Sequence, residues 1–494
     1  MNKKTFLIST AIDYPSEKPH LGHALEKVQA DVLARYKRLQ GFDVHFSTGL
    51  DQHGLKIQRY AQKAGKKPQE FVDEMNRFFK DLWKILNISN DDFIRTTEKR
   101  HEKVVQEILK KIYKKGDIYK GKYKGLYCVD CESFYLPKDL EGNLCPVHHK
   151  PVEAIEEETY FFRMSKYQKQ LLKHIKKNES FIIPESKRNE ISNRLKEPLQ
   201  DLSISRKTVK WGIPFPMNKK FTIAVWPEAL MNYLTTVNYP TSKFKKFWPG
   251  INVIGKDIVW HHAVIFPCLL FSAGLKLPKT IFIHGFITVD GQKMSKSLGN
   301  VIDPFELVKK YGTDTVRYFL LREILPTEDG DFTYEKFEAR YNADLAKGLG
   351  NLVARVITLA DKFKIPAFAK ATAGKQNSKI IKNTWDRYKK ALDEFRFNEA
   401  LISVWDLISF CDKYIEKERP WEKSGKQQLT INNLLFAVDN IARLLKPFLP
   451  ETSEKIFKQL KTKPSTKIWG RAKVKMRTQF SSPTKKSQSL FPRI

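Results

Sequence analysis

Two short segments, far apart in the chain, contain the residues best suited to bind phosphate. His20-Leu21-Gly22-His23 lies at a predicted strand-to-helix turn. There, free backbone N–H groups and the positive end of the helix dipole attract anions. His20 and His23 are three residues apart, so both imidazoles can lie on one side of the first turn, and Gly22 leaves room for a nucleotide to approach the backbone. Taken alone, the pattern also fits two surface histidines that occur there by chance.

The second segment is Lys293-Met294-Ser295-Lys296-Ser297, which Gly291 precedes and Gly299 follows. Two lysines three residues apart in a loop suit the negative charge that builds on a leaving pyrophosphate. By itself this segment could equally be a solvated basic loop. The two segments together indicate phosphate chemistry far more specifically than either one alone.

Cysteine and histidine residues form two closely spaced pairs that indicate a metal site. Cys128 and Cys131 are separated by two residues, and after 13 further residues Cys145 and His148 repeat the spacing. Thiolates and a neutral imidazole suit tetrahedral Zn²⁺. Four protein ligands leave no open position, so we expect one structural zinc ion per chain. His149 is an alternative fourth ligand, and a set of reduced thiols without metal is the other interpretation.

The elements that must position these residues predict an α/β fold. A strand over 5–11, a helix over 23–40 and a strand over 44–48 indicate the start of a parallel sheet. Strand patterns resume at 224–226, and an almost wholly helical pattern begins beyond Asn342. The predicted divisions are a Rossmann-type parallel-sheet catalytic domain in two halves (1–115 and 226–340), a zinc-containing insertion between them (116–225), an α-helical bundle (341–460) and a basic tail (461–494).

The charge of the chain predicts a polyanionic partner. Its 494 residues include 88 Lys and Arg against 55 Asp and Glu, a net charge of +33. Nucleic acid, an anionic membrane and a merely lysine-rich background are all compatible with this excess. Residues 341–460 hold 21 basic and 14 acidic side chains, and residues 461–494 hold ten basic and no acidic ones. About half of the excess therefore lies in the C-terminal third, which favours nucleic acid.

A membrane location is disfavoured by the hydrophobic pattern. No window of about 18 apolar residues exists, and the N-terminus lacks the apolar region and cleavage site of a signal peptide. We therefore expect a cytoplasmic protein with no membrane partner.

Together, the HxGH and KMSKS segments resemble the two motifs of the class I aminoacyl-tRNA synthetases. In that family both surround ATP, which binds with Mg²⁺, and stabilise the attack of an amino-acid carboxylate on the α-phosphate. A third match, the segment from Gly255 to His262, is similar to the G-x-D-x4-H segment whose Asp binds ribose hydroxyls. The resemblance implies catalytic roles for His20, His23, Lys293 and Lys296, and an ATP site that also includes Gly22, Gly255, Asp257 and Ser295.

Over nearly the whole chain the pattern is similar to the methionyl-tRNA synthetase branch of that family. Ala11-Ile12-Asp13-Tyr14 and Asp51-Gln52-His53-Gly54 match substrate-binding segments, in which Asp51 would face the substrate ammonium. Residues 225–233 resemble the segment whose Trp, Ala and Tyr enclose the thioether, and sulfur–aromatic contacts are favourable by roughly 0.3–1.5 kcal/mol. The implied methionine site consists of Ile12, Tyr14, Asp51, Trp226, Ala229, Tyr233, His262 and Phe266.

Two positions depart from the family pattern. Glu228 stands where Asp is expected, and His261 stands where an aromatic residue, usually Phe, is expected. The first change is conservative, and the second affects the shape of the pocket rather than the class of substrate. Without the resemblance, ordinary core packing would explain Trp226, Tyr233 and Phe266.

The helical C-terminal part resembles the anticodon-binding bundle of the same family. Asn351 and Arg355 are four residues apart, so they share a helix face and can hydrogen-bond to unstacked bases. Trp421 matches a Trp that stacks on an anticodon base, a contact worth about 1–3 kcal/mol. The alternative is that Asn351 and Arg355 pair within the bundle and that Trp421 packs.

The resemblance implies an enzyme that joins L-methionine to tRNA(Met), initiator tRNA included. The reaction would pass through methionyl-adenylate and release pyrophosphate and AMP. The insertion is similar to the single-knuckle version of the family. No oligomer-forming module follows Ile494, which predicts a monomer. A cysteine-specific class I synthetase and a tRNA-binding relative without activity are the competing hypotheses.

Overall fold

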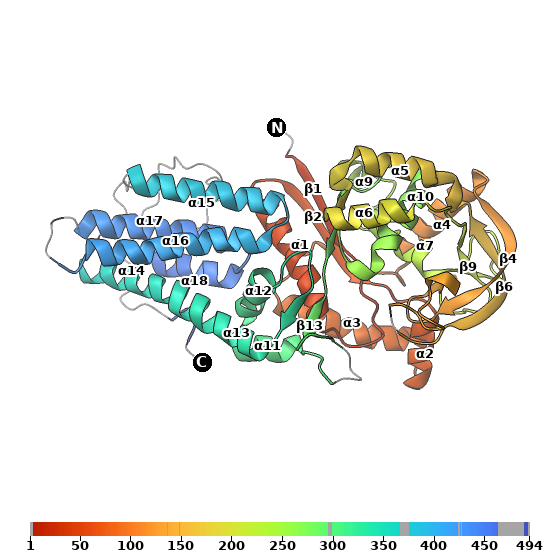
Figure 1. Ribbon diagram of the computed structural model, residues 1–494, viewed down its shortest axis with the longest axis horizontal. Coiled ribbons are helices and arrows are strands. Elements are labelled where there is room, and N and C mark those ends of the chain that lie inside the picture. Colours follow the sequence, from red (N-terminus) through yellow and green to blue (C-terminus); the bar gives the residue numbers. More distant parts are fainter. Residues whose placement is uncertain are drawn as a thin grey trace.

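The computed structural model describes most of the chain (Figure 1). An α/β body lies at one end of the elongated molecule, and a bundle of long helices lies at the other. Only the backbone is described at Lys138, Lys293 and 375–377. The described residues are 3–135, 137–147, 149–294, 299–365, 375–422, 425, 427–462 and 489–492.

A six-stranded parallel sheet forms the centre of the α/β body. Its strand order is β3-β2-β1-β11-β12-β7. Helices cover both faces, so central strands are continuous runs of buried residues, as in Thr280–His284. The strands are β1 (Thr5–Thr10), β2 (Asp43–Leu50), β3 (Asp92–Arg95), β7 (Ile182–Ile183), β11 (Ile251–Gly255) and β12 (Thr280–His284).

Helices join the strands of this sheet and pack on it. The first, α1 (Leu21–Leu39), follows β1, and its apolar face is buried against β1, β2 and β11. The other helices of the body are α2 (Leu55–Lys63), α3 (Pro68–Ile85), α4 (Lys99–Lys114), α7 (Val225–Ala229), α8 (Asn232–Thr235), α9 (Ser242–Phe247), α10 (Phe266–Ala273), α11 (Pro304–Tyr311), α12 (Thr313–Arg322) and α13 (Tyr334–Arg340).

Between β3 and β11 the chain forms a second, antiparallel sheet of order β5-β4-β6-β8. Strand β7 lies within the predicted insertion, 116–225, yet pairs with β12 at the edge of the main sheet. The insertion therefore contributes a strand to the main sheet instead of only interrupting it. Its elements are β4 (Ile118–Cys128), β5 (Ser133–Tyr135), β6 (Glu153–Phe162), α5 (Gln168–Lys177), α6 (Glu185–Arg194), β8 (Leu202–Ser203), β9 (Ser205–Arg206) and β10 (Thr222–Ile223).

Beyond α13 a π-helical segment, Tyr341–Gly350, leads into the helical bundle. One hydrophobic core runs from the face of α1 through α12 into the bundle, so the two parts are packed against each other. Among the described residues, none of the helices has the length and apolar character that a membrane span requires. The bundle helices are α14 (Asn351–Lys362), α15 (Lys375–Asp393), α16 (Phe397–Glu418), α17 (Gln427–Leu445) and α18 (Pro450–Leu460).

The predicted fold class, a split parallel-sheet domain followed by a helical bundle, is confirmed. The strand predicted at 224–226 is wrong, because helix α7 begins at Val225 and Pro227 is accommodated in its first turn. Strand β3 lies between α3 and α4 and pairs with β2 at the edge of the main sheet. The division points of the domains stay a prediction.

A buried arginine joins the two parts of the molecule. Arg317 of α12 is fully buried, and its Nη2 lies 2.7 Å from Oδ2 of Asp31 in α1. Its guanidinium also donates to the carbonyl oxygens of Leu86, Pro447 and Phe448, at 3.1, 3.0 and 2.8 Å. Burial opposes ionisation of Asp31, but Arg317 and a second arginine lower its pKa on balance. Helix α1 is thereby tied to the loop between α17 and α18 of the bundle.

Removing this arginine should strongly destabilise the protein. Arg317→Ala leaves the buried Asp31 with Arg35 as its one remaining ion-pair partner among the described residues and removes the donor to three carbonyl oxygens. We expect it to lower the free energy of unfolding by about 3–5 kcal/mol. Arg387 pairs with Asp406 on the surface, where both side chains are more than half exposed. Arg387→Ala should therefore change stability by no more than about 1 kcal/mol. Urea unfolding would measure both, and equal small losses would contradict the account.

Candidate active site and metal cluster

The HxGH turn, residues 20–23, forms the N-cap and the first residues of α1, after the loop that follows β1. His20 is the N-cap of α1, and its Nδ1 accepts a hydrogen bond from the Gly22 N–H at 3.1 Å. Nδ1 of His23 accepts from the His20 N–H, also at 3.1 Å. The ring centroids lie 4.1 Å apart. Since both Nδ1 atoms are acceptors, a neutral ring at either position carries its proton on Nε2, where it can donate.

The electrostatic environment of this turn favours neutral imidazole. Burial lowers the pKa of His23 well below its usual range, and the nearby His20 and Lys27 lower it further. Both rings sit beside the N-terminus of α1, whose free N–H groups suit an anion. The turn therefore combines backbone and side-chain donors at one place.

The hairpin that contains the start of the KMSKS segment lies against this turn. It consists of β13 (Ile287–Val289) and β14 (Gln292–Lys293). Cε of Met294 lies 3.5 Å from the position that a Cβ on Gly22 would take. The structure thus brings the two motifs together through Met294. The predicted site residues Ser295 and Lys296 lie outside the described residues, as does the side chain of Lys293.

The predicted ribose segment ends the neighbouring strand β11. Strands β1 and β11 pair in parallel, so the HxGH turn and Gly255 lie at the same edge of the sheet. A Cβ on Gly255 would lie only 2.8 Å from Oδ1 of Asp257. A side chain at this position would therefore shift the Asp257 carboxylate.

Asp51 follows β2 at this same edge. It is 6% exposed, and its Oδ1 has no hydrogen-bond partner among the described residues. Burial raises the pKa of Asp51 well above its usual range, and the carboxylates of Glu228 and Glu132 raise it further. A cation bound at Asp51 would offset this cost, because it would stabilise the ionised form.

The predicted aromatic pocket is assembled around two adjacent histidines. The Tyr233 hydroxyl lies 2.8 Å from Nε2 of His262, whose Nδ1 lies 2.9 Å from the Ile258 carbonyl. A carbonyl can only accept, so Nδ1 carries the proton and Nε2 accepts from Tyr233. Burial lowers the pKa of His262 to about 4, so this ring is neutral near pH 7. Phe266 lies against Tyr233, with ring centroids 5.5 Å apart.

His261 occupies the position where the family pattern predicts an aromatic side chain. Its ring stacks on Trp226, with centroids 3.6 Å apart and planes at 16°. Its Nε2 lies 3.2 Å from the Ser133 hydroxyl. The His261 ring therefore stacks on Trp226 at the position where the family pattern predicts an aromatic side chain. The remaining predicted pocket residues lie at the same end of the sheet: Ile12 and Tyr14 are half-buried after β1, and Ala229 is buried in α7.

Glu228, the other departure, is completely buried. Its two oxygens lie 3.0 Å from Nδ1 of His53 and 3.0 Å from Nε2 of His101. The nearby histidines lower the pKa of Glu228, against the opposing effect of burial. The longer Glu side chain is therefore held by two partners from different elements. Sequence reasoning missed His101, because a single histidine in an amphipathic helix carries no local signal.

A second set of buried charges lies beside the HxGH turn and was also missed. Nζ of Lys27 is 2.6 Å from Asp13 and 2.8 Å from Glu26. His284 approaches the other oxygen of Glu26 at 3.2 Å. Burial raises the pKa of Asp13 to about 7 despite the opposing effect of Lys27. The letters E-K inside an amphipathic helix give no sign that both side chains point inward.

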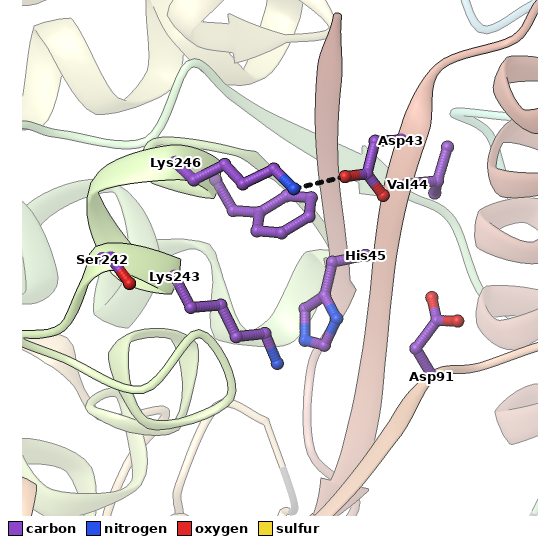
Figure 2. A pocket seen from close by; sticks show the side chains of 8 residues that line it. Asp43, Val44, His45, Asp91, Ser242, Lys243 and Lys246 are labelled. Carbon is purple, nitrogen blue, oxygen red and sulfur yellow. Dashed lines mark ion pairs between the residues drawn. The ribbon is translucent and has the colours of Figure 1, made fainter. Parts of the chain in front are cut away.

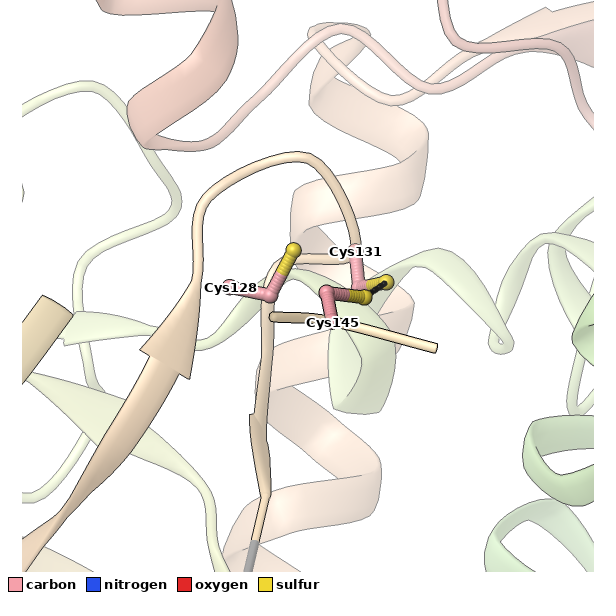
Figure 3. A group of neighbouring side chains, drawn as sticks. All are labelled: Cys128, Cys131 and Cys145. Atoms are coloured by element: carbon pink, nitrogen blue, oxygen red, sulfur yellow. Dashed lines mark hydrogen bonds between the residues drawn. The ribbon is translucent and has the colours of Figure 1, made fainter. Parts of the chain in front are cut away.

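Three cysteines converge at the end of β4 (Figure 3). The sulfur atoms of Cys128, Cys131 and Cys145 all lie within 4.8 Å of one another, which is compact enough to hold a metal ion. His148 lies outside the described residues. His149 pairs with Glu141 at 3.2 Å and has a side chain 65% exposed, so it is not part of the cluster. The chemistry of the donors suits Zn²⁺.

The metal cluster is directly connected to the aromatic pocket. The Cys131 carbonyl accepts a hydrogen bond from the Trp226 indole N–H at 2.9 Å and one from the Ser133 hydroxyl at 3.1 Å. The adjacent Glu132 accepts from the Tyr14 hydroxyl at 3.1 Å. Residues of the cysteine loop therefore contact two residues of the predicted methionine site, Trp226 and Tyr14. Glu132 carried no recognisable signal in the sequence.

The predicted anticodon residues lie at the helical end of the molecule. Asn351 is exposed at the start of α14. Arg355, on the same helix, lies 2.5 Å from Glu416 and 3.6 Å from Asp412, both of α16. The alternative of pairing within the bundle therefore holds for Arg355 in this structure. Trp421 follows α16 and is 43% exposed, so it is not a buried core residue.

A surface hollow of about 450 Å³ lies elsewhere (Figure 2). Its walls come from the start of β2 and from α9, at the amino end of the sheet. Ligands of open parallel sheets bind outside the carboxyl ends of the strands. The hollow is therefore separate from the site described above. It is lined by Asp43, Val44, His45, Asp91, Ser242, Lys243, Lys246 and Phe247.

Comparison with known proteins assigns this architecture to a class. Residues 6–154 and 135–357 match the family model described as tRNA synthetases class I (M). Residues 379–489 match the model of the anticodon-binding domain of tRNA ligase. The chain is therefore a class I aminoacyl-tRNA synthetase.

Individual relatives identify the branch. The methionine–tRNA ligases of Caldanaerobacter subterraneus and Thermotoga maritima are each 44% identical to it, over 100% and 93% of this chain and 79% and 76% of theirs. The structure of Mycobacterium tuberculosis methionyl-tRNA synthetase in complex with methionyl-adenylate aligns with a TM-score of 0.94 at 36% identity, covering 99% of this chain and 100% of that one. The chain belongs to the methionyl-tRNA synthetase family, as its sequence predicted.

Proposed function

We propose that this chain charges tRNA(Met) with L-methionine for protein synthesis. ATP and methionine would react to methionyl-adenylate and pyrophosphate, and the methionyl group would then pass to the terminal ribose of the tRNA with release of AMP. The observation that carries this proposal is the arrangement at the carboxyl edge of the sheet. There a buried carboxylate with no cation partner among the described residues, an aromatic pocket and a turn suited to anions lie at the ends of adjacent strands.

In the proposed adenylation step, the protein stabilises charge and forms no covalent bond. The Nε2–H groups of His20 and His23 donate to phosphate oxygens, and Lys293 and Lys296 neutralise the departing pyrophosphate. The Asp257 carboxylate accepts from the ribose hydroxyls. ATP is expected to bring Mg²⁺, which neutralises further phosphate charge. Gly22, Gly255 and Ser295 complete the proposed ATP site.

For methionine, we propose that Asp51 binds the ammonium group. Trp226, Tyr233 and Phe266 would enclose the thioether, where sulfur–aromatic contacts are favourable. His262 is held neutral and accepts from Tyr233, so the pocket presents no charge to the sulfur. Ile12, Tyr14, Ala229 and His262 complete the proposed site.

At the other end of the molecule, we propose that Asn351, Arg355 and Trp421 bind the anticodon, initiator tRNA included. The exposure of Trp421 supports stacking on a base. Arg355 would have to exchange Glu416 for a base or phosphate when tRNA binds. The cytoplasmic location and the monomeric state stay predictions.

The amino-acid dependence of pyrophosphate exchange tests the proposed function. The purified protein should exchange pyrophosphate into ATP when L-methionine is present. Cysteine, leucine and isoleucine should support at most about a hundredth of this rate. Cysteine is too short to bring its sulfur to the aromatic rings, and leucine and isoleucine are branched and have no sulfur. Comparable exchange with another amino acid would overturn the substrate assignment.

We also propose that the cysteine cluster holds one Zn²⁺ per chain, with His148 as the fourth ligand. Bound zinc would fix the loop that contacts Trp226 and Tyr14. Elemental analysis of the purified protein should find one zinc per chain.

Matched cysteine variants would show whether the cluster is responsible. Cys145→Ser should lose the zinc, because a thiolate ligand is removed. Cys268 is buried in α10, apart from the cluster, so Cys268→Ser should retain it. Absence of zinc from the unaltered protein, or its retention by Cys145→Ser, would refute this assignment.

A further inference from the structure

A short acidic segment, residues 328–332, lies beside the hairpin that contains the start of the KMSKS segment. It includes β15 (Gly330–Phe332), which pairs in parallel with β13. The resulting small sheet has the order β14-β13-β15. Phe332 is fully buried and packs against Phe319 of α12 and Phe337 of α13. The segment is therefore fixed to the core on one side and to the hairpin on the other.

Asp331 connects the acidic segment to the β13–β14 hairpin. Its Oδ1 accepts hydrogen bonds from the Gly291 N–H and from the Thr288 hydroxyl, both at 2.8 Å. Its Oδ2 lies 3.2 Å from Nζ of Lys336, a pair that is partly exposed to solvent. One oxygen therefore binds the hairpin, and the other faces a surface lysine.

The turn that Asp331 holds sets the direction of the hairpin. Asp290 and Gly291 have φ values of 51° and 74°, as required at the two central positions of a type I′ turn. Thr288 pairs with Lys293 across this turn. Fixing the Gly291 N–H therefore fixes the backbone of Lys293 and the start of the segment that contacts the HxGH turn through Met294.

The same acidic segment also contacts residues next to the proposed ribose-binding Asp257. Asp329 accepts from the Phe286 N–H at 2.8 Å, and its other oxygen lies 2.6 Å from Nζ of Lys256. Lys256 directly precedes Asp257. Backbone approach is so close here that a Cβ on Gly285 would lie 2.1 Å from the Glu328 carbonyl oxygen. One segment thus contacts two nucleotide-binding elements.

We propose that Asp331 is a positioning residue for adenylation, which holds the β13–β14 hairpin in register with the HxGH turn. Asp331 acts through the backbone of the hairpin and does not itself touch substrate. The inference rests on the proposed function, because it assigns Asp331 a role in that same reaction. Displacement of a charge-stabilising group by about 1 Å can slow catalysis about 100-fold, so a single lost anchor is measurable.

Three variants separate this role from a general structural one. Asp331→Ala removes both acceptors, and we expect kcat of methionine-dependent pyrophosphate exchange to fall at least about tenfold. The KM for methionine should stay within about twofold, because the methionine pocket is not contacted. Asp331→Asn keeps an acceptor oxygen for Gly291 and Thr288 and should retain kcat within about threefold. Lys336→Ala removes only the exposed ion pair and should behave like the unaltered protein.

The pattern across the variants decides the matter. Equal losses in Asp331→Ala and Asp331→Asn would overturn the proposal, because the charge and not the hydrogen bonds to the hairpin would then be responsible. A parallel rise in the KM for methionine, with a lowered melting temperature, would also overturn it and indicate general damage. Normal kcat in Asp331→Ala, with exchange intact in the unaltered protein, would overturn this inference alone. Absence of exchange in the unaltered protein would overturn both proposals.

Discussion

Arg317 and Asp31 form an ion pair that is completely buried, and both parts of the molecule are built around it. A charge in the interior is tolerated only when partners compensate for its lost hydration. Arg317 finds them on α1, at the end of α3 and in the loop that precedes α18. Helix α1 begins at the HxGH turn, so this turn and the helical bundle are tied to the same buried ion pair.

The same constraint explains the site itself. Lys27 is paired with Asp13 and Glu26, and Glu228 is held by two histidines. Asp51 differs, because among the described residues it has no ion-pair partner and one of its oxygens has no hydrogen bond. Its raised pKa reflects this unfavourable position. A ligand that brings an ammonium group would complete the pairing, and this is the physical basis for placing the amino group of methionine there.

Local patterns in the sequence predicted the parts that depend on near neighbours. The HxGH turn, the cysteine spacing and the α/β alternation are each visible within a few tens of residues of sequence. The predicted α/β alternation agrees with the parallel order of the main sheet. Family resemblance added the pocket residues. Trp226 packs against the core, as the packing interpretation expects, and it also contacts His261 and the Cys131 carbonyl, so its role in substrate binding stays a prediction.

What the sequence could not predict are partners from distant elements. Nothing near Asp31 indicates Arg317, and nothing near Glu228 indicates His101. The strand expected at 224–226 failed because apolar residues fit a buried helix as well as a strand over so short a stretch. Arg355 likewise pairs with Glu416, and the two residues meet because α14 packs against α16.

The most direct test of the account concerns Asp51 and the substrate ammonium. Isothermal titration calorimetry would compare L-methionine with 4-(methylsulfanyl)butanoic acid, which lacks the amino group, on the unaltered protein and on Asp51→Asn. Loss of the amino group should weaken binding to the unaltered protein at least about tenfold, because a charge-assisted hydrogen bond is lost. In Asp51→Asn the two ligands should bind within about threefold of each other. The same large difference in both proteins would contradict the account, because the ammonium would then be bound elsewhere.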